Sequence, residues 1–176
     1  GPGLIHALVG FAETQLRGQA PVEARLLLEQ VRQPHEQLEP ALFPADFLPR
    51  VTHLQAQCCR GEGRFAESRA LLEGLLQGKA VRTRLVHLDL GLAEGGFRWL
   101  SEVEVPRQQA EVEGMSQRLR SGHRHFELAL ADKRSPAALY VLGVLHLLEG
   151  EPAEAAGRLE HACNRAAQDE ESYRPA

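Results

Sequence analysis

The chain has 176 residues, of which 43% are hydrophobic and 25% are charged, a balance typical of a globular protein with a buried core. The formal net charge of −4 disfavours a dedicated nucleic-acid binder, because such proteins are usually basic. No apolar run approaches the ~20 residues that a membrane-spanning helix needs, so we also expect no membrane association.

Three cysteines, of which Cys58 and Cys59 are adjacent, cannot form a paired disulfide framework. Unpaired cysteines are typical of proteins from reducing compartments. We therefore expect an intracellular protein of the cytoplasm or the nucleus.

The first predicted elements form a helical hairpin over residues 4–33. After Gly1-Pro2-Gly3, which is typical of the remnant of a cleaved expression tag, apolar residues recur at helical spacing. Gly18 ends this run, and Pro21 opens a second amphipathic run. The prolines that follow predict a loop or a broken short helix, because proline lacks the backbone N–H of a continuous helix: Pro34, Pro40, Pro44 and Pro49.

Two further hairpins are predicted over residues 50–77 and 80–104. The first turns at Gly63. In the second, apolar and polar residues alternate from Val86 to Leu92 as in a strand, but leucines also recur at the i, i+3 and i+7 positions of a helix. We predict a helix here, because a lone strand would leave its backbone groups unpaired.

The last third of the chain is predicted to contain an inserted helix over residues 106–134, a final hairpin over 136–168 and a tail over 170–176. Pro106 suits the first turn of the inserted helix, and Gly122 is expected to kink or divide it. Glycines between successive apolar runs mark the turns, and such self-similarity indicates a repeat array; these glycines are at positions 18, 63, 95 and 150.

Residues 136–169 resemble a tetratricopeptide repeat (TPR). The matching positions are Leu139, Leu142, Gly143, Gly150, Glu154, Ala155, Leu159 and Ala162. Small residues at Gly143 and Ala155 suit the crossing point of two packed helices. The resemblance implies an all-α fold, a TPR-like α-solenoid of antiparallel helical hairpins with one inserted helical segment, in a single domain over residues 4–169.

The resemblance also implies a function, which is to act as a protein–protein interaction scaffold. TPR domains bind a partner peptide or protein segment on the concave face that their first helices line. The corresponding residues of the last repeat are apolar: Ala137, Tyr140, Val141, Val144, Leu147 and Leu148. We expect them to bind an apolar segment with Tyr140 as an anchor. Alternatively, they pack on another repeat of a longer parent chain or on a second copy of this one.

No residue pattern indicates catalysis, a metal site or a bound cofactor. His123 and His125 are two positions apart, which on a helix corresponds to about 200° of rotation, so their rings cannot share a metal ion. We therefore expect a scaffold without enzymatic activity. The alternative function is a regulatory or substrate-presenting domain of a larger multidomain enzyme.

Overall fold

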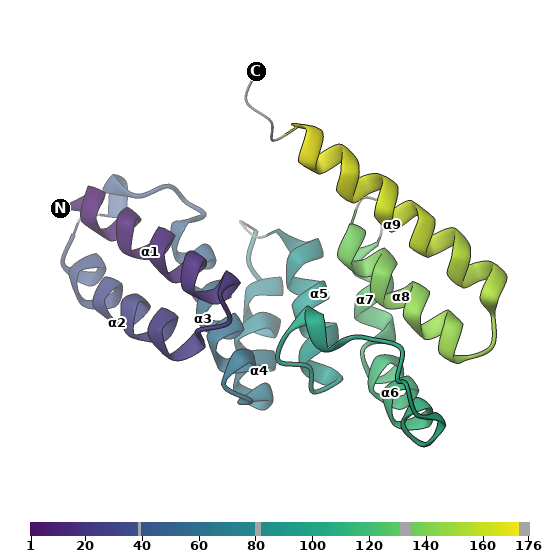
Figure 1. The fold of residues 1–176 in the computed structure, drawn as a ribbon. Coiled ribbons are helices and arrows are strands. Elements are labelled where there is room, and N and C mark those ends of the chain that lie inside the picture. Colours follow the sequence, from purple (N-terminus) through teal and green to yellow (C-terminus); the bar gives the residue numbers. More distant parts are fainter. Residues whose placement is uncertain (39, 80–81, 131–134, 173–176) are drawn as a thin grey trace. The chain divides into compact units, whose positions relative to one another are not determined.

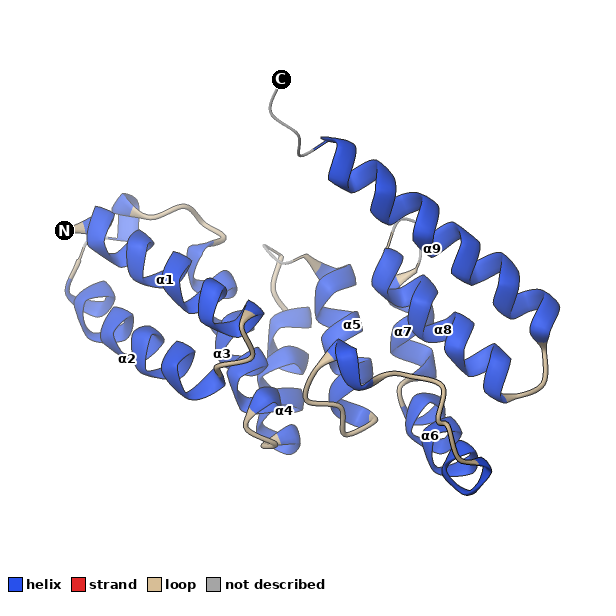
Figure 2. Cartoon of the chain, in the orientation of Figure 1, coloured by secondary structure: helices blue, strands red, loops and turns tan. Residues whose placement is uncertain are grey.

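The described residues form helices joined by turns and loops, with no strand among them (Figure 2). The computed structural model describes residues 1–38, 40–79, 82–130 and 135–172. Helices that follow one another pack as neighbouring pairs (Figure 1), which confirms the predicted all-α array of helical hairpins. The chain divides into two compact units, Gly1–Arg82 and Thr83–Ala176, where the sequence had predicted one domain.

Unit 1 contains two helical hairpins. Helix α1 packs on α2, α3 packs on α4, and the two hairpins meet where α2 packs on α3. Each helix buries one apolar stripe, as its periodicity predicts. The elements are α1 Pro2–Arg17, α2 Pro21–Gln37, the 3-10 turn η1 Pro40–Leu42, α3 Phe47–Gly61 and α4 Phe65–Leu76. The two hairpins occupy much the same ranges as those predicted over 4–33 and 50–77.

The boundaries of the first two helices differ from the prediction. Helix α1 begins at Pro2, so the second and third residues of the proposed tag remnant belong to the first helix. Helix α2 continues through Pro34 to Gln37. A proline removes one backbone hydrogen bond, and so close to the helix end that loss does not prevent the last turn from forming.

Unit 2 contains five helices in its described part. The run around Leu88 is helical, as predicted, and Gly122 divides the inserted segment into two helices. The elements are α5 Thr83–Glu94, the 3-10 turn η2 Leu100–Glu102, α6 Gln109–Ser121, α7 His123–Ala129, α8 Pro136–Leu148 and α9 Pro152–Ser172. The α8–α9 hairpin is confirmed. Residues 131–134 and 173–176 lie outside the described part, although residues 170–172 of the predicted tail are helical.

The predicted hairpin over residues 80–104 does not form. Only the short turn η2 follows α5 before residue 104, and α5 packs instead on α7, which belongs to the predicted insertion. Two glycines permit this pairing, because a Cβ atom on Gly122 would collide with the Gly91 carbonyl group, and one on Gly91 would lie 2.5 Å from the Phe126 ring. Pro106 lies in the loop before α6 and not in its first turn.

Arg118 of α6 binds the turn that follows α5, where the predicted second helix of the 80–104 hairpin does not form. Its guanidinium Nε donates to the Gly95 carbonyl and its Nη2 to the Gly96 carbonyl, both at 2.9 Å. The same guanidinium lies 4.0 Å above the centre of the buried Phe97 ring. Arg118 therefore satisfies carbonyl groups at a helix end that the following chain does not cover.

The helices α8 and α9 cross closely at a glycine, as the sequence predicts. A Cβ atom on Gly143 would lie 2.8 Å from both Cγ and Cδ2 of Leu159, closer than real Cβ atoms approach. Ala155, the other small residue of the predicted crossing, is 1% exposed. The apolar face of α8 that surrounds Gly143 joins Phe97, Leu119 and Phe126 in one core.

Candidate functional site

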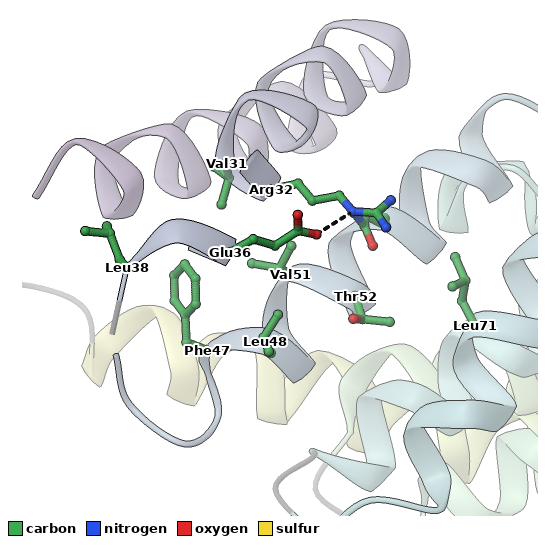
Figure 3. Close-up of a pocket in the computed structure, with 10 residues that line it drawn as sticks. Val31, Arg32, Glu36, Leu38, Phe47, Leu48, Val51, Thr52 and Leu71 are labelled. Carbon is green, nitrogen blue, oxygen red and sulfur yellow. Dashed lines mark hydrogen bonds and ion pairs between the residues drawn. The ribbon is translucent and has the colours of Figure 1, made fainter. Parts of the chain in front are cut away.

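An open apolar groove of about 620 Å³ lies in unit 1, between α2, α3 and α4 (Figure 3). We name it the α2–α3–α4 groove. Its residues on α3 recur at the i, i+1, i+4, i+5 and i+8 positions, which is one stripe along a helix. The lining residues are Val31, Arg32, Glu36, Leu38, Phe47, Leu48, Val51, Thr52, Gln55 and Leu71.

The base of the groove is apolar, and its edge carries a paired charge. Val31, Phe47 and Val51 are buried, whereas the Leu48 side chain is 54% exposed. Arg32 donates from Nε to Glu36 at 3.3 Å, one helical turn further along α2 (Figure 3). Because this exposed pair is neutral as a whole, the groove presents an apolar surface with little net charge.

Aromatic packing and the proline-rich segment hold one end of the groove in place. The rings of Phe43 and Phe47 stack with centroids 4.7 Å apart, and His6 of α1 meets the Phe47 ring edge-on at 5.2 Å. Phe47 therefore connects α1, the segment before α3 and the groove.

A partly buried carboxylate fixes the helices on either side of the groove. Glu62, which follows α3, accepts from Nε of Arg25 on α2 at 2.8 Å and from Nη2 of Arg64 at 2.6 Å. Burial alone would raise the pKa of Glu62, but hydrogen bonds and charge from these two arginines lower it below 4.5, its ordinary value. Glu62 therefore remains ionised at neutral pH and ties α2 to the α3–α4 turn.

Two of the six predicted partner-binding residues of α8 do not lie on a surface. Val141 is 0% exposed and Val144 is 2% exposed, and both belong to the core of unit 2. Neither side chain is accessible to a partner, because α8 packs against α6, α7 and α9 at once. The prediction that these two residues line a binding face is wrong for this structure.

The other four predicted residues are covered to different extents. Tyr140 donates its hydroxyl hydrogen to the Val103 carbonyl at 2.6 Å, so it has a structural role in unit 2. Ala137 is half-buried, Leu148 packs against the core, and Leu147 is 41% exposed. Of the six residues, Leu147 alone is exposed.

Sequence analysis missed the α2–α3–α4 groove, because its residues come from two predicted hairpins and the proline-rich segment between them. One signal was available, since apolar residues at positions 47 and 48 precede the predicted start of the third helix at residue 50 and continue the apolar pattern of Val51. The prolines around that run favoured a loop instead, and α3 begins at Phe47 with Pro49 in its first turn, where proline is tolerated.

The titratable side chains of the described part of the chain lie in distinct environments. Burial raises the pKa of the Cys58 thiol to about 12, so this thiol is protonated at neutral pH and is not a nucleophile. Among the described residues, no three His, Cys, Asp or Glu side chains converge on one metal position. His123 pairs with Glu127, and His125 pairs with Glu94.

No described helix combines the length and the apolar character that crossing a membrane requires. We compared the chain with protein-family models, with curated proteins and with solved structures, and none of the three comparisons found a match.

Proposed function

We propose that this chain is a protein–protein interaction scaffold of TPR type, which binds an apolar segment of a partner in the α2–α3–α4 groove. The observation that supports the proposal is an open groove with a buried apolar base and an exposed leucine, Leu48, at its edge. Exposed apolar surface of this kind usually marks an interface. In this proposal the chain performs no catalysis and needs no cofactor.

The shape and chemistry of the groove indicate the kind of segment that it would bind. A groove of about 620 Å³ between three helices has room for a few large side chains rather than for a whole domain. Leu48, Val51 and Leu71 favour leucine-like or aromatic side chains, which a helix presents at i and i+3 or i+4 positions. Thr52 and Gln55 offer hydrogen bonds to the polar edge of such a segment.

Selection from a library of displayed peptides, followed by affinity measurements on the whole chain, tests this proposal. Leu48→Glu places a charge at the groove. We expect it to raise the Kd of the selected peptide at least about tenfold. Leu26→Glu is the matched control, because Leu26 is 48% exposed in the same unit and does not line the groove.

A third variant separates the groove from the surface predicted on α8. Leu147→Glu changes the exposed α8 residue and is expected to leave the peptide affinity unchanged. Equal affinities for Leu48→Glu and Leu26→Glu would overturn the groove as the binding site, and selective loss with Leu147→Glu would place the site on α8. Light scattering of the same samples reports whether a second copy of the chain occupies the groove instead.

A further inference from the structure

Two histidines from different helices meet inside unit 2. The Nδ1 atoms of His87 on α5 and His125 on α7 lie 2.9 Å apart, and their rings stack with centroids separated by 5.2 Å. On its other side, His125 places Nε2 3.2 Å from a carboxylate oxygen of Glu94. His125 and Glu94 are 18% and 26% exposed, so all three groups form a partly buried chain between α5 and α7.

The contact restricts the positions of the protons. A hydrogen bond between two Nδ1 atoms needs one N–H donor and one bare nitrogen acceptor. Glu94 favours a proton on Nε2 of His125, so His87 donates from Nδ1 to Nδ1 of a neutral His125. If His125 gains one proton, the direction reverses and His87 accepts. If both rings are protonated, two N–H groups face each other and the hydrogen bond is lost.

The two rings have different charged neighbours. Arg124, which precedes His125 on α7, opposes a positive charge on His87. Glu94 at the end of α5 stabilises a charged His125. Asp89 is buried two residues beyond His87, a spacing that places it on another side of α5.

Charged groups on the other helices packed against α5 and α7 have partners of their own. On α6, Arg118 bonds to the carbonyl groups after α5, and Arg120 bonds to Glu149. On α8, His146 bonds to Glu151. Glu127 of α7 pairs with His123 and with Arg158 of α9.

We propose that His87 and His125 form a pH-sensitive contact between α5 and α7, which holds one added proton and loosens when both rings become protonated. The contact joins the pair of helices that replaces the missing third hairpin, so its loss would weaken the packing of α5 on α7.

The direction of the pH effect follows from His87. Burial, together with the charges of His125 and Arg124, lowers the pKa of His87 below its ordinary value of 6.5. The unfolded chain therefore gains this proton at a higher pH than the folded chain does. His87 leaves stability unchanged above about pH 6.5, and stability falls as the pH decreases from 6.5 through the lowered pKa of the folded state.

Thermal unfolding of the whole chain between pH 7.5 and pH 5.0 tests the proposal. His87→Phe keeps a ring against His125 but cannot titrate, and His123→Gln on the same helix α7 is the matched control. We expect the wild type and His123→Gln to lose more than about 2 °C of Tm beyond the loss in His87→Phe. Equal losses in all three proteins would overturn the proposal.

Nuclear magnetic resonance of the unmodified chain, labelled with ¹⁵N in its histidines, gives a second test that needs no variant. We expect His87 to titrate below 6.5, its ordinary pKa, and the donor at Nδ1 to reverse as the pair takes up its first proton. In His125→Phe, the His87 titration should move to higher pH. If His87 titrates at its ordinary value in the unmodified chain, the shared-proton contact does not exist.

Discussion

At the residue scale, four turns share one backbone conformation. Residues with positive φ end α1, α3, α5 and α8, and the residue that follows each of them donates to a carbonyl five positions back at 2.8–2.9 Å. These four residues are Gln19, Gly63, Gly96 and Gly150. The pattern satisfies the last carbonyl groups of each helix and reverses the chain. The repeat of this protein is therefore visible in its turns even where a hairpin is missing.

A substitution at Gly150 measures how much the positive φ of a turn residue matters for stability. Its φ is +78° and a Cβ atom there would meet nothing within 4 Å, so Gly150→Ala introduces backbone strain without a clash. We expect the free energy of unfolding, measured by urea denaturation, to fall by about 1–2 kcal/mol.

Gly157 is the matched control for this prediction. It lies exposed within α9, and a Cβ atom there also meets nothing within 4 Å. Gly157→Ala is expected to raise the free energy of unfolding by about 1 kcal/mol, because alanine favours a helix. If both substitutions change stability in the same direction, the left-handed turn at Gly150 is not the cause.

The sequence located these turns to within one residue, but not always the residue with positive φ. The glycine pattern pointed to Gly18 and Gly95, whereas Gln19 and Gly96 have positive φ. Which of two adjacent residues takes this conformation depends on where the helix makes its last hydrogen bond, and composition does not show that point. The contact of His87 with His125 could not be predicted from the sequence either, because it depends on the pairing of α5 with α7.

At the element scale, close helix pairs depend on glycine. Gly143 allows α8 to approach Leu159 of α9, and Gly91 allows α5 to approach Phe126 of α7. A glycine within a helix costs about 1 kcal/mol relative to alanine, so the closer packing must compensate for that loss. The sequence identified the first crossing through the TPR pattern, and it missed the second because Gly91 and Gly122 belong to segments that were assigned to different elements.

Gly143→Ala is expected to lower the free energy of unfolding by about 1–3 kcal/mol, because the added methyl group meets Cγ and Cδ2 of Leu159 at 2.8 Å. Leu159→Ala removes those atoms, so the double variant should be more stable than the sum of the single effects predicts. A double-mutant cycle by urea denaturation measures this coupling. Strict additivity would show that the two helices do not cross at Gly143.

Helix ends in both units also share an acidic residue that bonds to a different helix. Glu62 accepts from Arg25 of α2, and Glu149 accepts from Arg120 of α6 at 2.5 Å. Glu94 makes the corresponding contact with His125 of α7. Because these partners are distant in the sequence, the turn glycines marked the turns without indicating these contacts.

At the scale of the whole molecule, the candidate binding site belongs to one unit. All residues that line the α2–α3–α4 groove lie within Gly1–Arg82. We expect the fragment 1–82 to be helical by circular dichroism and to bind a groove-selected peptide with a Kd within about threefold of that of the whole chain. A folded fragment with no affinity would contradict the assignment of the site to unit 1.

The fold class could be predicted from the sequence, but the binding surface could not. Periodicity and turn glycines identify helices one at a time, whereas a surface depends on which faces remain uncovered after packing. Helix α8 illustrates the difference, since it contains no Asp, Glu, Lys or Arg from Pro136 to Leu148 and is apolar on nearly every side. Such a composition favours a helix surrounded by others, which is how α8 lies against α6, α7 and α9.

Because Arg118 holds the turn after α5, we expect the chain to tolerate an insertion shortly after that turn. Elsewhere a hairpin turn is held by the helix that comes next, so an insertion there would pull the pair apart. After α5, the turn is secured from the side by α6, and Val103 is secured by Tyr140. The mostly exposed stretch 104–108 therefore does not hold the chain reversal together. We expect an insertion there, such as an affinity epitope or a fluorophore, to be tolerated.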